Sequence, residues 1–169
     1  MAGHSATIGM TGSGKSTLER ARAAEFKRRG FGVLVLDPWT SPDWSCDFIS
    51  DELDAFLRVV KRSRRCALFV EEAGDFGRDP RFAWLFTQAR HWGHITHYVS
   101  QYHAQVPPIV RTNCERLHLF RVAQRSADVW ADDFAQADIA DLAGRLDRYQ
   151  YVSAGRYGAP RVCMLRLST

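Results

Sequence analysis

The sequence lacks several features that would assign a function class at once. Its four cysteines, at positions 46, 66, 114 and 163, form no CxxC pair, which argues against a disulfide framework and against a zinc knuckle. No apolar run is long enough to span a bilayer, and the first ten residues lack the basic and apolar regions of a signal peptide. The sequence contains no internal repeat and no low-complexity segment. We therefore expect reduced thiols and a cytoplasmic protein.

The composition is that of an ordinary globular protein with a modest excess of positive charge. Of the 169 residues, 46% are hydrophobic and 25% are charged, and the formal net charge is +4. This length predicts a single domain over residues 1–169. Most of the basic residues are arginines, whose planar guanidinium groups pair well with phosphates. The charge therefore permits a nucleotide or nucleic-acid partner without requiring one.

Strand-like and helix-like segments alternate along the chain. The expected strands cover residues 4–9, 32–37, 66–70, 95–100 and 116–122. The expected helices cover residues 16–29, 51–61 and 80–91, and residues 126–146 are expected to form one or two helices. Residues 103–110 are expected to form a loop, and residues 148–167 a terminal hairpin. On the first helix, Leu18, Ala21, Ala24 and Phe26 are the predicted inward residues; on the second they are Leu53, Phe56, Leu57 and Val60. The order predicts an α/β fold with a mainly parallel sheet covered by helices on both faces.

The segment GMTGSGKS, residues 9–16, matches the phosphate-binding motif G-x-x-x-x-G-K-[ST] in full. Glycines allow the backbone to turn its N–H groups inward as a nest for anions. Lys15 would place a charge on the β and γ phosphates, and Ser16 would offer its hydroxyl to Mg²⁺. The following helix would present its positive end to the phosphates. The expected nucleotide-binding residues are Gly9, Met10, Thr11, Gly12, Ser13, Gly14, Lys15, Ser16 and Thr17.

Two adjacent carboxylates follow the apolar run CALFV. Glu71 is predicted to hold Mg²⁺, opposite Ser16, and Glu72 is predicted to polarise the water that attacks the γ-phosphate. An apolar strand followed by an acid and a glutamate favours an ATP hydrolase over a kinase. Because the metal position is more often aspartate, the two roles could be exchanged, and Asp75 is a nearby alternative.

With these motifs the chain resembles the HerA–FtsK superfamily of DNA-pumping ATPases, and within it the small genome-packaging ATPases of tailless, membrane-containing icosahedral phages. The resemblance covers about residues 7–134. It depends on GMTGSGKST, on VLVLDP, on ALFVEE and on QARHWGHITHYVSQ, residues 88–101. It implies a RecA-like fold, with Gln101 sensing the γ-phosphate and Arg90 reaching the ATP of a neighbouring subunit.

The resemblance also implies cofactors and partners. These are ATP, Mg²⁺, double-stranded DNA bound without sequence preference, a ring-shaped homo-oligomer that is often a hexamer, and a capsid or portal component. The location would be the host cytoplasm if the gene is viral. Three alternatives remain open: an assembly ATPase resembling the zonula occludens toxin-like proteins of filamentous phages, a small P-loop kinase, and a nucleotide-gated binding module without turnover.

Overall fold

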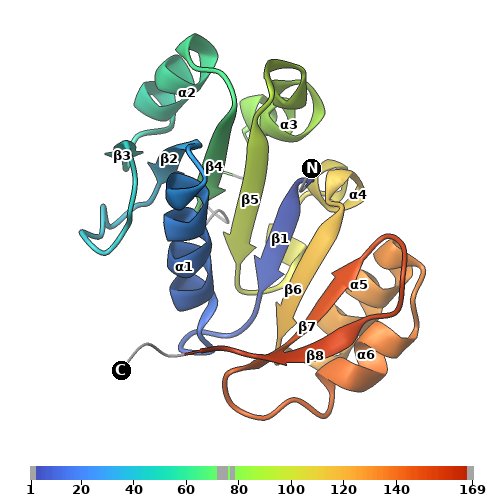
Figure 1. Ribbon diagram of the computed structural model, residues 1–169. Coiled ribbons are helices and arrows are strands. Elements are labelled where there is room, and N and C mark those ends of the chain that lie inside the picture. The colour runs from blue at the N-terminus through green and yellow to red at the C-terminus, as the bar shows by residue number, and fades with distance from the viewer. Residues whose placement is uncertain (1–2, 72–75, 77–78, 167–169) are drawn as a thin grey trace.

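The computed structural model describes residues 3–71, 76 and 79–166, and they form one eight-stranded sheet in the order β3-β2-β4-β5-β1-β6-β7-β8 (Figure 1). The strands are β1 (Ser5–Ile8), β2 (Gly32–Leu36), β3 (Phe48–Ser50), β4 (Cys66–Val70), β5 (Ile95–Ser100), β6 (Arg116–Phe120), β7 (Gln150–Gly155) and β8 (Arg161–Met164). The helices are α1 (Lys15–Arg28), α2 (Leu53–Arg62), α3 (Pro80–Thr87), α4 (Pro108–Asn113), α5 (Gln124–Phe134) and α6 (Asp138–Ala143), with short 3₁₀ turns η1 (Ala89–Trp92) and η2 (His103–Gln105).

In the order of the sheet, the first six strands, β3, β2, β4, β5, β1 and β6, pair in parallel. β7 and β8 add an antiparallel hairpin beside β6. This arrangement confirms the predicted α/β class, the mainly parallel sheet and the terminal hairpin. Two short elements were not predicted. β3 lies beyond the proline-rich loop that follows β2, and α4 occupies a segment that was expected to be a loop.

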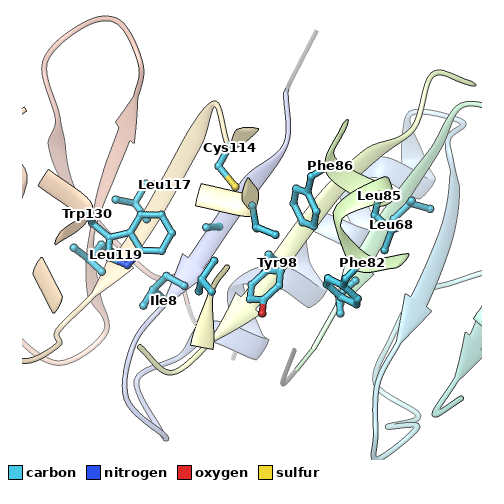
Figure 2. Close-up of a cluster of buried hydrophobic side chains, with 14 of the residues drawn as sticks. Ile8, Leu68, Phe82, Leu85, Phe86, Tyr98, Cys114, Leu117, Leu119 and Trp130 are labelled. Atoms are coloured by element: carbon cyan, nitrogen blue, oxygen red, sulfur yellow. The ribbon is translucent and has the colours of Figure 1, made fainter. Parts of the chain in front are cut away.

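The helices cover the two faces of the sheet unequally. Figure 1 shows α1 in front of the sheet, with α5 and α6 behind its C-terminal strands. The main core lies on the second face, where side chains of α2 to α6 pack on the strands. Figure 2 shows part of this core, with Phe82, Phe86 and Tyr98 on one side and Leu117 and Trp130 on the other. Because both faces are covered, β4 and β5 are buried along their whole length.

Helix α1 differs from its predicted packing. Leu18 and Phe26 are buried as expected, but Ala21 is exposed and Ala24 is only partly buried. The sheet instead covers Glu19, which is completely buried, and Ala23. Helical geometry brings residues three or four apart onto one face, so Glu19 lies on the same face as Ala23 and Phe26. The predicted inward residues of α2 are all buried, as expected.

The cysteines agree with a further expectation. All four cysteines are free thiols. Among the residues that the structure describes, no helix has the length and apolar character needed to cross a membrane.

Candidate nucleotide-binding site

The glycine-rich segment forms a tight loop between β1 and α1. Gly12 and Gly14 adopt positive φ angles of 76° and 108°, which L-residues with a side chain rarely adopt. The N–H of Ser13 donates to the carbonyl of Met10 at 3.2 Å. Helix α1 begins at Lys15, so its N-terminal N–H groups lie at the end of the loop. This is the backbone geometry of an anion nest next to a helix N-terminus.

The loop also packs closely against side chains from later parts of the chain. A Cβ atom on Gly14 would lie 2.6 Å from Leu165 Cδ2, and one on Gly9 would lie 2.5 Å from Phe120 Cβ. Real Cβ atoms do not approach heavy atoms so closely. Glycine at these two positions therefore allows the loop to rest on β6 and on the residue that follows β8.

Three of the predicted phosphate- and metal-binding groups, Lys15, Ser16 and Glu71, lie at the mouth of this loop. Lys15 is largely buried, and its Nζ donates to the carbonyl of Met10 at 3.0 Å. Ser16 Oγ donates a hydrogen bond to Glu71 Oε1. Hydroxyl and carboxylate oxygens are the ligands that Mg²⁺ accepts, so this pair fits a magnesium ion held between α1 and the end of β4.

The strand order explains why Glu71 and Gln101 both lie beside the loop. Parallel strands end at the same edge of the sheet, and β5 lies between β4 and β1. Gln101 directly follows β5, between the loop and Glu71 in strand order. Its N–H donates to Gln105 Oε1 at 3.1 Å, and the same oxygen accepts from Ser100 Oγ at 2.8 Å. Gln105 thus fixes the end of β5 from the following turn, although no motif in the sequence marks this residue.

A cavity of about 260 Å³ lies on the other side of the loop. Its lining residues are Met10, Thr11, Gly12, Ser13, Phe120, Arg121, Asp147, Arg148, Tyr149 and Gln150. The guanidinium carbon of Arg148 lies 4.8 Å from the centre of the Tyr149 ring, and Tyr149 itself adopts a positive φ of 64°. The segment 147–150 was not assigned to the site from the sequence, because no recognisable motif marks it.

A buried polar network lies behind the loop, between α1 and the sheet. Glu19 Oε1 accepts hydrogen bonds from Thr7 Oγ1 at 2.5 Å and from Arg22 at 2.7 Å. Arg22 also contacts Ser5 Oγ and His97 Nδ1, and these two atoms are 2.8 Å apart. Burial, followed by the nearby Arg22 charge, holds the pKa of His97 well below its ordinary value. Thr7 lies on β1 and Glu19 on α1, so the network connects the two elements that flank the loop.

Arg90 lies near the amino end of β5, at the end of the sheet opposite the phosphate loop. It is exposed in the 3₁₀ turn that precedes β5, whereas the phosphate loop follows the end of β1. It shares a small cavity with His4 and His94. Burial, and secondarily the Arg90 charge, lowers the pKa of His4 to about 4. The fold therefore does not bring Arg90 to the phosphate loop of its own chain.

Two sequence predictions cannot be placed. Glu72 and the alternative Asp75 lie outside the described residues. The role of Glu72 therefore remains a prediction from the sequence.

No protein-family model and no curated protein sequence matches the chain. Solved structures do resemble it. The genome packaging NTPase B204 from Sulfolobus turreted icosahedral virus 2, in complex with AMPPCP, has a TM-score of 0.79 at 15% identity, over 95% of this chain and 96% of that protein. VirB4 of Thermoanaerobacter pseudethanolicus has a TM-score of 0.71 at 9% identity, over 98% and 90% of the two chains.

The N-terminal domain of zonular occludens toxin from Neisseria meningitidis is also similar, but less so. Its TM-score is 0.54 at 14% identity, over 73% of this chain and 80% of that domain. The fold of this chain is thus more similar to that of the packaging NTPase than to that of the toxin domain, in both TM-score and coverage. The chain has the fold of the packaging NTPase B204, which is the fold that its resemblance to the HerA–FtsK superfamily implied.

Proposed function

We propose that this chain is an ATP-hydrolysing motor subunit that translocates double-stranded DNA, and that it packages a viral genome. The observation that carries the proposal is the contact between Ser16 and Glu71 at the mouth of a glycine loop, in a fold shared along nearly its whole length with a genome packaging NTPase. The contact and the glycine loop support a phosphate and magnesium site, and the shared fold supports genome packaging as the process that the site would drive.

In this proposal the loop N–H groups and Lys15 hold the β and γ phosphates of ATP. The 260 Å³ cavity beside the loop gives room for the part of the nucleotide beyond the phosphates. Ser16 and Glu71 hold Mg²⁺, which neutralises charge on the phosphates when it is bound. Glu72 orients and polarises the attacking water, and Gln101 senses whether the γ-phosphate is present.

Arg90 acts on a neighbouring subunit in this proposal. Its place at the far edge of the sheet supports that assignment, since an arginine there can reach a phosphate loop only across an interface between subunits. A homo-oligomeric ring, a hexamer in the most common arrangement of the superfamily, would provide that interface at every site. The further partners would be duplex DNA and a capsid or portal component, in the cytoplasm of the host.

The proposal is tested by measuring phosphate release from ATP with and without linear duplex DNA. We expect hydrolysis to require Mg²⁺, to rise severalfold with DNA, and to respond equally to duplexes of unrelated sequence. The variant Lys15→Ala serves as the inactive control. Transfer of the phosphate to a small acceptor would instead indicate a kinase, and ATP binding without turnover would indicate a binding module.

A further inference from the structure

A second pocket, of about 500 Å³, lies at the end of the sheet opposite the phosphate loop, where the parallel strands begin. It is formed where β6 begins, where β7 ends and where β8 begins, and the polar side chains that line it include those of Arg116, Ser153, Tyr157 and Arg161. Because β6 runs parallel to β1, the start of β6 and the loop that follows β1 lie at opposite edges. The pocket is therefore separate from the nucleotide site.

The strand register places its cationic side chains on one face. Ser153 pairs with His118 on β6 and with Arg161 on β8. Arg116 lies two residues before His118 and therefore points to the same face. Gly155 pairs with Arg116 and has no side chain, which leaves the space beside Arg116 open. The two arginines thus flank a hollow on the face that α1 covers elsewhere.

These two arginines carry positive charge that the protein does not neutralise. Both are exposed, and neither forms an ion pair with a carboxylate in the part of the chain that the structure describes. Glu115 is the acidic residue that lines the pocket, but its carboxylate lies against Gly3, where a Cβ atom would be only 2.0 Å from Glu115 Oε2. The pocket therefore offers a net positive surface to an anion.

The base of the hairpin is rigidly attached to the rest of the protein. Arg156 donates to the carbonyls of Cys114 at 2.9 Å, Arg111 at 2.8 Å and Thr112 at 3.1 Å. Its guanidinium also lies 4.3 Å from the centre of the Phe134 ring. The guanidinium of this third arginine thus holds the hairpin in place, and the arginines of the pocket that face a ligand are Arg116 and Arg161. Beyond Arg156, the ring of Tyr157 is 95% exposed.

We propose that this pocket, which we call the hairpin pocket, binds the phosphate backbone of duplex DNA. The inference rests on the proposed function and names the surface on which that motor would hold its DNA. The two guanidinium groups, the Ser153 hydroxyl and the Tyr157 hydroxyl are all donors to phosphate oxygens. Contacts to phosphate oxygens carry no sequence information, as a protein that moves along every sequence requires.

The test compares two double variants that remove the same charge. Arg116→Gln with Arg161→Gln changes the hairpin pocket. Arg29→Gln with Arg58→Gln removes two exposed arginines that do not line it. DNA binding is measured by fluorescence anisotropy with a short duplex over a series of salt concentrations, and ATP affinity and basal hydrolysis are measured in parallel.

We expect the pocket variant to bind DNA more weakly and to lose about two units from the slope of log K against log salt concentration, because each lost phosphate contact accounts for about 0.9. ATP affinity and basal hydrolysis should stay unchanged, and the Arg29/Arg58 variant should keep the full slope. An unchanged slope in the pocket variant, or an equal loss in both variants, would overturn the inference while leaving the motor function standing. Altered subunit assembly with unchanged DNA binding would also overturn it, and would assign the pocket to a protein interface. If the unaltered protein binds no DNA at all, both the inference and the proposed function fail.

Discussion

Ser16 on α1 donates a hydrogen bond to Glu71 at the end of β4, although 55 residues separate them in sequence. The contact links the phosphate loop to the carboxylate that follows β4. In the proposed mechanism Glu71 holds Mg²⁺ and Glu72 polarises the attacking water. Glu71→Gln should weaken Mg²⁺-dependent ATP binding and hydrolysis together. Glu72→Gln should lower turnover by about 10²–10⁴-fold, the usual contribution of a general base, and leave ATP affinity nearly intact.

Nucleotide affinity with and without Mg²⁺, alongside steady-state hydrolysis, distinguishes the two glutamates. Reversed phenotypes would mean that Glu71 is the catalytic base and Glu72 the metal ligand. If neither variant loses hydrolysis, the paired-carboxylate interpretation is wrong.

Arg90 should act across a subunit interface. Arg90→Ala subunits should bind ATP but hydrolyse it about 10³-fold more slowly, the effect of losing an arginine finger in related chemistry. Mixing them with Lys15→Ala subunits should restore part of the activity, because some interfaces then combine an intact Lys15 with an intact Arg90. Mixed oligomers, verified by mass, that regain no hydrolysis would count against the assignment.

The buried pair of Glu19 and Arg22 should contribute far more stability than its exposed counterpart on the same helix. Both Glu19–Arg22 and Glu25–Arg28 are spaced by three residues, but Glu19 is fully buried whereas the Glu25 side chain is 50% exposed. Glu19→Gln leaves the Arg22 guanidinium, whose side chain is only 18% exposed, without its counter-charge, and should lower the free energy of unfolding by about 3 kcal/mol. Glu25→Gln should lower it by less than about 1 kcal/mol. Urea denaturation measures both, and equal losses would contradict the structural difference.

Acid should destabilise the fold through buried histidines. The pKa of His4 is about 4 in the folded protein and 6.5 without its surroundings, so between these values the unfolded chain binds a proton that the folded chain excludes. The free energy of unfolding should therefore fall as pH falls from 6.5 to 4, by about 3 kcal/mol through His4 alone. Burial shifts the pKa of His97 and His118 in the same direction.

The pH prediction is checked by urea denaturation at several pH values. His4→Gln should flatten the pH dependence, because glutamine can accept the hydrogen bond that Thr96 N–H donates to His4 Nδ1 without gaining a charge. His91→Gln is the control, since His91 is exposed. An unchanged slope in His4→Gln would show that His4 is not the group responsible.

The parts of the fold that the sequence predicts are those with strong local signals. The run CALFV is β4 with the bounds expected from its apolar character, and the alternation of strands and helices gives the parallel sheet. β3 could not be foreseen because three half-buried residues carry too little pattern. Only part of the buried face of α1 could be predicted, since Glu19 is held inside by Thr7 and Arg22, partners that only the folded chain brings together.

The same distinction applies to the candidate site. Lys15, Ser16 and Glu71 belong to motifs with fixed spacing, and the structure brings them together at one edge of the sheet. Residues 147–150 lie beside the loop because the chain comes back to this end of the sheet after α6. Gln105 contacts the end of β5 from a turn whose sequence has no distinctive pattern. Such contacts follow from topology, and a single sequence contains no local record of them.

The packing of Leu165 against Gly14 has a consequence for the order in which the protein is made. A ribosome completes the phosphate loop early, but the side chain that closes one wall of the loop is added only after nearly all of the described chain has been synthesised. The central strand β1 likewise cannot form its strand pairs until β5 and β6, its neighbours on either side, have been synthesised. A nascent chain therefore carries the complete glycine motif long before the residues that pack against the loop have been synthesised.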